Sequence, residues 1–164
     1  MRNIKQICIF VSMVFFAQLC PAADYISENE YIDLSGVSDQ FGVTISFSVR
    51  YLLYGPGKTE SEAIVSYLST NASFCTKNGV LFLMDIQAIP GMIVKLFVNP
   101  SMKKYPFPVF PDTKGIIAPR IPVRSEHVTL VQLADTKTEN ISFIALSDIT
   151  EQFKKIQQNT QQTK

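Results

Sequence analysis

The sequence is poor in the side chains that bind transition metals or form disulfides. It contains one histidine, His127, and three cysteines, of which Cys8 and Cys20 lie close to the N-terminus. A zinc site needs three or four histidine or cysteine ligands, and beyond the N-terminal region only Cys75 joins His127. The carboxylates are scattered without the spacing of a calcium-binding loop. We therefore predict no metal site, no cofactor and no internal disulfide.

The sequence also lacks a clear excess of positive charge and a second long hydrophobic run. It has 15 Lys and Arg against 14 Asp and Glu. A general nucleic-acid-binding protein would be clearly basic, so we predict no nucleic-acid partner. After residue 23, no segment approaches the roughly 20 apolar residues that a membrane-spanning helix needs. We therefore expect no transmembrane segment in the remainder of the chain.

The N-terminus, in contrast, carries the three-part pattern of a secretory signal. Arg2 and Lys5 precede an apolar run over residues 7–19, and Cys20-Pro21-Ala22-Ala23 follows it. A basic start, a short hydrophobic stretch and small residues at the exit are typical of a cleaved signal peptide. We predict a signal peptide over residues 1–23 and an exported protein, periplasmic or extracellular. An uncleaved N-terminal anchor is the alternative.

The remaining residues predict a single β-rich domain over 24–158, followed by a disordered tail over 159–164. Apolar and polar side chains alternate from Val43 to Arg50, which is the pattern of a strand with one buried face. Apolar runs between turn residues predict four further strands. Residues 80–89 and 92–98 are expected to form one hairpin, and residues 127–133 and 141–146 another.

Two short helices complete the expected domain. Thr59 and Glu62 fit a capping box, which predicts a helix over about 60–69. A second helix is expected to start near Asp148. The fold class is therefore predicted to be mainly β, an antiparallel β-sandwich of about six strands with two short helices. An α+β plait is the alternative.

One irregular segment stands out as a candidate binding site. From Tyr105 to Pro111, prolines alternate with large apolar residues, which favours an extended conformation with a preset backbone. Either the segment is a crossover loop pinned over the sheet, or it is an exposed apolar ridge that docks a protein partner. The candidate partner-binding residues are Lys103, Lys104, Tyr105, Phe107, Val109 and Phe110.

Charge is distributed unevenly along the chain. Residues 24–39 hold five acids and no base, whereas residues 86–124 hold six bases and one acid, Asp112. The two regions either offset each other on the surface, or the basic region contacts an acidic partner or membrane headgroups. A peripheral contact with a membrane is thus the second interpretation. The bases are Lys95, Lys103, Lys104, Lys114, Arg120 and Arg124.

The segment from Gly55 to Thr59 looks like a phosphate-binding loop, but its spacing is wrong. That motif needs a glycine five residues before the Gly-Lys pair, where this chain has Leu52. The loop is too short to wrap backbone amides around a phosphate. We therefore reject a nucleotide site.

These observations favour an exported, non-enzymatic binding or assembly protein that acts through a sheet edge or the loop 103–111. The alternative is a secreted hydrolase in which Cys75 or pairs of carboxylates converge in a cleft. Candidate carboxylate pairs are Asp33 with Asp39 and Asp85 with Asp112. Asn71 and Asn140 also match the N-glycosylation pattern, which matters only in a host that glycosylates exported proteins.

Overall fold

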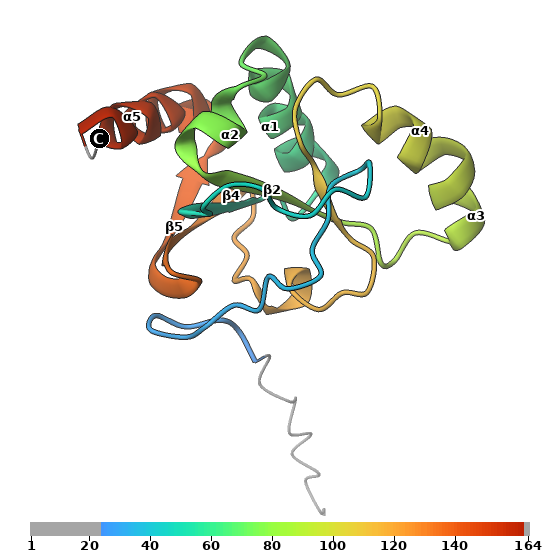
Figure 1. The fold of residues 1–164 in the computed structure, drawn as a ribbon, viewed down its shortest axis with the longest axis horizontal. Helices are drawn as coiled ribbons and strands as arrows, with labels where there is room; N and C mark the ends of the chain where they lie inside the picture. Colours follow the sequence, from blue (N-terminus) through green and yellow to red (C-terminus); the bar gives the residue numbers. More distant parts are fainter. Residues whose placement is uncertain (1–23, 163–164) are drawn as a thin grey trace, which may run out of the picture.

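The computed structural model describes residues 24–162 and contains one five-stranded mixed sheet with the strand order β3-β2-β1-β4-β5 (Figure 1). Strands β1, β2 and β3 are mutually parallel. Strand β4 runs antiparallel to β1, and β5 runs antiparallel to β4. The strands are β1 (Tyr51–Tyr54), β2 (Val80–Asp85), β3 (Phe110–Asp112), β4 (His127–Ala134) and β5 (Lys137–Ala145).

The protein therefore has a mixed α/β fold, and the predicted antiparallel β-sandwich is wrong. Two expected strands are not present in the sheet. Residues 92–98 are helical, and residues 43–49 form no strand; of the predicted strand only Arg50 bonds to the sheet, where its carbonyl accepts the N–H of Leu133. Between β1 and β2 the chain crosses over through a helix, so these two strands are parallel.

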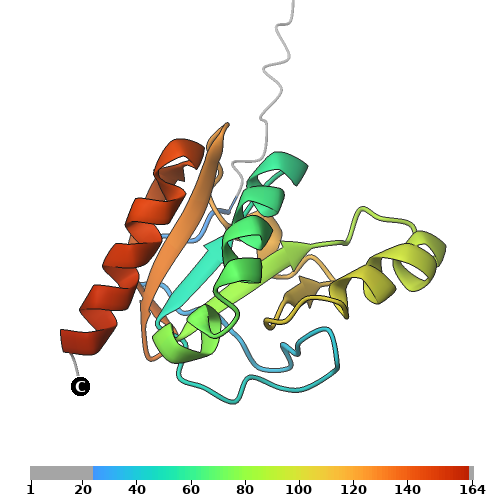
Figure 2. The same ribbon diagram turned by 90° about the horizontal axis from the view of Figure 1, so that it is seen from above.

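Helices α1 (Lys58–Thr70), α2 (Phe74–Asn78) and α5 (Ile149–Gln162) cover one face of the sheet (Figures 1 and 2). Their buried side chains pack on Leu53 and Phe82 from the two central strands. Tyr67, Phe74 and Phe153 form an aromatic cluster between these helices, with ring centroids 4.9–5.4 Å apart. Burial of this apolar layer is the main favourable contribution on this side of the sheet.

The opposite face of the sheet is covered by chain with little regular secondary structure. Residues 24–50 and 113–125 lie across it, together with the short helix η2 (Ala118–Arg120), which is seen below the sheet in Figure 1. Their apolar side chains pack against Leu52, Leu81 and Val131. The acidic and basic regions of the sequence meet here, because Arg120 forms an ion pair with Glu30.

A third helical region extends away from the sheet. It consists of α3 (Gly91–Ile93), the π-helical η1 (Val94–Val98) and α4 (Asn99–Met102) in one continuous run. Figures 1 and 2 both place it at the end of the molecule farthest from α5. Pro100 has no N–H to donate to the carbonyl of Leu96, so the π turn occurs where the α-helical pattern cannot continue.

Several sequence predictions are confirmed at the level of elements. The last two strands form the expected antiparallel hairpin, closed by Asp135 and Thr136 with positive φ. Helix α1 is present, although it begins at Lys58 and no side chain caps it, so the expected capping box is not formed. After the 3-10 turn η3 (Leu146–Asp148), α5 reaches Gln162, so residues 159–162 are helical where we expected a disordered tail.

None of the helices in residues 24–162 combines the length and the hydrophobicity that crossing a bilayer requires. The predicted signal peptide, residues 1–23, lies outside the described residues.

Candidate functional site: a groove beside the proline–aromatic segment

The proline–aromatic segment is divided between surface and core. Lys103 and Lys104 are exposed, and Tyr105 is half-buried. Phe107, Val109 and Phe110 are each at most 2% exposed. Phe107 and Val109 pack in the core on the helical side of the sheet, whereas Phe110 packs on the other side. These three side chains therefore anchor the segment and cannot form an exposed ridge in this conformation.

A buried glutamine fixes the backbone of this segment. Gln40 donates from Nε2 to the carbonyl oxygen of Phe107 over 2.9 Å, and its Oε1 accepts the N–H of Val109 over 2.8 Å. Strand β3, which follows directly, lies at the edge of the sheet. The side-chain amide thus supplies the donor and the acceptor that a neighbouring strand would supply. A segment 67 residues away in sequence is held in register by one side chain.

The chain next to Gln40 forms the second wall of the site. Asp39 organises a turn there, because its Oδ1 accepts the N–H groups of Phe41 and Val43, each over 2.9 Å. Its own N–H donates to the carbonyl of Val43 over 2.8 Å. After the turn, the chain from Thr44 to Val49 runs along the face of the sheet opposite the helices, where Ile45, Phe47 and Val49 pack. Phe47 contacts Phe110 edge to face, with 6.3 Å between ring centroids.

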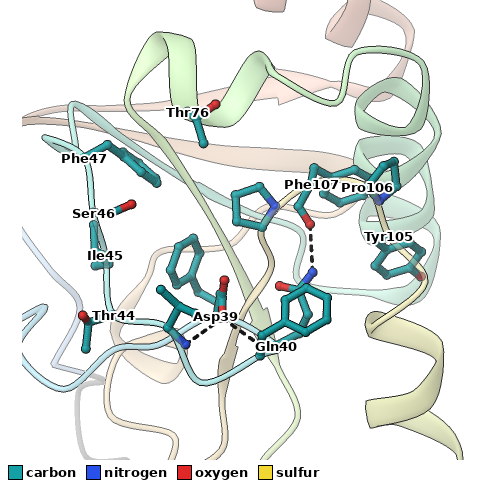
Figure 3. A pocket seen from close by; sticks show the side chains of 14 residues that line it. Asp39, Gln40, Thr44, Ile45, Ser46, Phe47, Thr76, Tyr105, Pro106 and Phe107 are labelled. Atoms are coloured by element: carbon teal, nitrogen blue, oxygen red, sulfur yellow. Dashed lines mark hydrogen bonds between the residues drawn. The ribbon is translucent and has the colours of Figure 1, made fainter.

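Between these two walls lies a groove of about 330 Å³ (Figure 3). This volume is at the lower end of the range for ligand-binding pockets. Figure 3 shows Phe47 on one side and Pro106 and Phe107 on the other, with Gln40 below Phe107 and bonded to its carbonyl. We call this cavity the 39–47/105–110 groove. Its lining comprises Asp39, Gln40, Phe41, Val43, Thr44, Ile45, Ser46, Phe47, Thr76, Tyr105, Pro106, Phe107, Pro108 and Phe110.

The 43–49 wall keeps much of the alternation that predicted a strand, but its backbone has few partners after Thr44. Ile45, Phe47 and Val49 are half-buried, whereas Thr44, Ser46 and Ser48 are exposed. Ser38 and Thr44 form an isolated bridge at its start. From Ile45 to Ser48, no backbone N–H or C=O bonds to another backbone group in residues 24–162. Residues 45–47 therefore leave their backbone N–H and C=O groups without a backbone partner, as at the edge of a sheet, whereas the carbonyl oxygen of Ser48 faces Gly79.

The electrostatics of the groove suit binding rather than acid–base chemistry. Its lining contains one carboxylate, Asp39, and that group already accepts two backbone N–H groups. Its other walls are aromatic, proline and aliphatic groups with small hydroxyls. Phe41 and Val43 are more than half exposed at its rim. Such a surface can bury an apolar group and bond an extended backbone.

The two outer strands of the sheet differ in how far their edges are covered. On the β3 side, the side chain of Gln40 bonds to the backbone of Phe107 and Val109 just before the strand. Within the strand, Pro111 has no N–H to donate. On the β5 side, Thr138 donates to the carbonyl of Glu30 over 2.8 Å and accepts the N–H of Asn29 over 2.7 Å. The start of β5 is thus covered by the N-terminal segment of the described chain.

Cys75 is placed where a nucleophile could not act. It is fully buried on α2 among apolar side chains. Burial raises the pKa of its thiol to about 12, so the reactive thiolate does not form at neutral pH. His127 lies at the start of β4, with Nδ1 2.6 Å from the carbonyl oxygen of Ser125. No hydrogen bond joins His127 to Cys75, so the two do not form a nucleophile–base pair in this structure.

Of the two candidate carboxylate pairs, the fold brings one together. Asp85 and Asp112 are register partners on β2 and β3. Asp112 is buried, which raises its pKa, but backbone N–H groups of Ala118, Ile117, Ile116 and Gly115 lower it by more. Its net pKa lies below the usual value, so it is ionised and cannot serve as a general acid.

Both carboxylates of this pair have structural partners. Asp112 accepts N–H groups from the loop that leads into η2, over 2.8–3.1 Å. Asp85 accepts the N–H of Gln87 over 3.0 Å. They lie near Tyr54, whose pKa is raised by burial and by both negative charges. Within residues 24–162, no three His, Cys, Asp or Glu side chains are grouped so as to hold a metal ion.

Asp33 and Asp39, the other candidate pair, lie on different cavities. Asp33 lines a cavity of about 230 Å³ together with Asp112, whereas Asp39 lines the 39–47/105–110 groove. Hydrogen bonds from the side chain and N–H of Ser35 lower the pKa of Asp33. Of the two glycosylation candidates, Asn140 is exposed on β5, whereas Nδ2 of Asn71 donates to the carbonyl of Tyr67 over 2.9 Å.

The 39–47 wall and the role of Gln40 have no signal in the sequence strong enough to predict them. A single glutamine in a polar stretch carries no local signal, because its partners are 67 and 69 residues away. The sequence held one relevant signal. The strand-like alternation over residues 43–50 follows an acidic, polar stretch and has no evident partner strand, which could have pointed to an unpaired segment.

No family model matches the sequence, and no curated protein matches it. Among solved structures, the chain is similar to a domain of a possible thiol-disulfide isomerase from Cytophaga hutchinsonii. The TM-score is 0.46 at 12% identity, over 85% of this chain and 99% of that one.

Proposed function

We propose that this chain is an exported, non-enzymatic binding protein that takes an extended segment of a protein partner into the 39–47/105–110 groove. The unpaired backbone from Ile45 to Ser48 is the observation that carries the proposal. A partner strand laid along it would satisfy these groups, which is the mode of recognition known as β-strand addition.

The lining of the groove supports an apolar partner sequence. In an added strand, every second side chain points to the same face. Those side chains would meet Phe47 and Pro106, while the rim residues Phe41 and Val43 would lose their exposed area to the partner. Since Asp39 is the groove's one carboxylate and is occupied, the expected segment is uncharged, with apolar residues at alternate positions.

Both walls of the groove are held in place before a partner binds, which favours tight binding. The prolines at 106 and 108 and the Gln40 hydrogen bonds fix one wall, and the Asp39 turn fixes the start of the other. A preorganised site loses little conformational entropy when it binds. Export is proposed from the signal pattern of residues 1–23, and assembly with another exported protein is the setting in which such a site would act.

Selection from a library of random peptides of about 10 residues, which is long enough for an added strand, tests the proposal. The expected winners alternate apolar with small polar residues. Their affinity is then measured by fluorescence anisotropy for Val43→Lys, at the groove, and for Val123→Lys, a matched exposed valine elsewhere. Val43→Lys should weaken binding at least about tenfold. Equal binding by both variants, or no enriched peptide, would overturn the proposal.

A further inference from the structure

The helical run from Gly91 to Met102 presents a continuous apolar face to solvent. Met92 is 72% exposed, Leu96 61% and Phe97 62%, and Ile93 between them is 42% exposed. Their spacing, two adjacent residues repeated after four positions, places all four on one side of the run. The inner side holds Val94, Val98 and Met102, which pack against the core. The four outer side chains therefore do not pack against the core and contribute little to the stability of the fold.

Only positive charge accompanies this face. Lys95 belongs to the same run, and Lys103 and Lys104 follow it directly; all three are exposed. None of the three forms an ion pair with any residue from 24 to 162. From Ile86 to Pro111 the sequence contains no Asp or Glu. A surface with apolar side chains beside unpaired lysines is complementary to an apolar layer bordered by negative charge.

We propose that this helical run docks on an anionic lipid surface. A bilayer interface offers both features together: acyl chains for the four apolar side chains and acidic headgroups for the lysines. The position of the run fits this role, because Figures 1 and 2 place it at one end of the molecule, where it can reach a flat surface before the rest of the fold. The site is separate from the groove lining, so this proposal does not depend on the proposed peptide binding.

The absence of tryptophan from the sequence provides a local probe. Phe97→Trp places a single fluorophore on the apolar face, and Val123→Trp places one on a half-exposed control site elsewhere. Both variants are made in the full chain and titrated with vesicles of phosphatidylglycerol and phosphatidylcholine. Because the signal is local, attachment of any other part of the chain does not imitate it.

The expected result is a blue shift in the emission of the Phe97→Trp variant, with quenching by brominated lipid, on vesicles containing phosphatidylglycerol. Changing Lys95, Lys103 and Lys104 to Gln should raise the lipid concentration at half-saturation about fivefold per lysine, and added salt should do likewise. The emission of the Val123→Trp control should stay unchanged.

Three results would overturn the proposal: no shift on anionic vesicles, an equal shift on pure phosphatidylcholine, or a shift that depends on protein concentration without lipid. The last would assign the face to a second copy of the chain. Circular dichroism of each variant confirms that the fold is retained, which is expected because every changed residue is exposed.

Discussion

The side chain of Gln40 acts as a substitute strand for the backbone at Val109. Its Oε1 accepts the N–H of Val109 over 2.8 Å, while its Nε2 donates to the carbonyl two residues earlier over 2.9 Å. Both backbone groups are buried with the glutamine. One wall of the groove and the start of β3 are therefore held by a residue from a distant part of the chain.

Replacing Gln40 by Ala should destabilise the protein by about 1–3 kcal/mol, because it leaves a buried N–H and a buried C=O without partners. Gln158→Ala, an exposed glutamine on α5, is the matched control and should change stability by less than about 0.5 kcal/mol. The free energy of unfolding in urea measures both. Equal effects of the two substitutions would mean that the Gln40 hydrogen bonds contribute nothing.

Gly79 should be intolerant of any side chain. Its φ is +65°, and a Cβ there would lie 2.5 Å from the carbonyl oxygen of Ser48. Gly79→Ala should cost more than the roughly 1–2 kcal/mol of left-handed backbone alone. Gly36→Ala isolates that backbone cost, since Gly36 has φ +77° and open space around its Cβ position. Urea unfolding should rank Gly79→Ala as the worse of the two; the reverse order would contradict the close approach of Ser48.

Asp112 should make stability depend on acidic pH. Its pKa in the folded protein is below its ordinary value of 3.8. At higher pH the carboxylate is ionised in both states and its full contribution is present. As pH falls below the ordinary value, the unfolded state takes up the proton first, so stability is lost until the folded carboxyl is also protonated.

Asp112→Asn should lower the free energy of unfolding by about 1–3 kcal/mol at neutral pH and flatten the decline in acid. Thermal unfolding followed from neutral to acidic pH measures this difference. Asp148→Asn is the control, because Asp148 is exposed on the short helix η3. A parallel acid decline in wild type and Asp112→Asn would contradict the assignment.

Cys75 should be chemically silent in the folded protein. With its pKa at about 12 and no exposed surface, it should resist iodoacetamide in mildly alkaline buffer and react fully in urea. Mass spectrometry of the Cys75 peptide distinguishes it from the other cysteines of the chain. Rapid alkylation of the native protein would show a reachable thiolate and reopen a nucleophilic role.

The parts of the fold that were predicted from sequence are those with local signals. The β4–β5 hairpin, α1 and the start of α5 follow from periodicity and turn residues close to one another in the chain. Parallel pairing of β1 and β2 has no such signal, because the partners are separated by the crossover helix. Assigning 92–98 to a strand failed because Val, Ile and Phe favour strands, whereas here tertiary position makes them helical.

The candidate site was predicted in part. Composition drew attention to Tyr105–Pro111, and that segment does line a cavity. Its largest side chains turned out to be anchors, because alternation along an extended segment does not reveal which face is buried. The opposite wall could be found only in three dimensions. The alternation at 43–49 does follow the burial of Ile45, Phe47 and Val49, but the strand that it predicted is not formed.

Hydrogen–deuterium exchange of the amides from Ile45 to Ser48 tests strand addition most directly. These N–H groups have no backbone partner in residues 24–162, so they should exchange rapidly in the free protein. When a selected peptide is bound, alternate amides of this stretch should slow by at least about tenfold, as N–H groups enter a new ladder. If the bound peptide leaves exchange of all four amides unchanged, the groove does not bind its partner as an added strand.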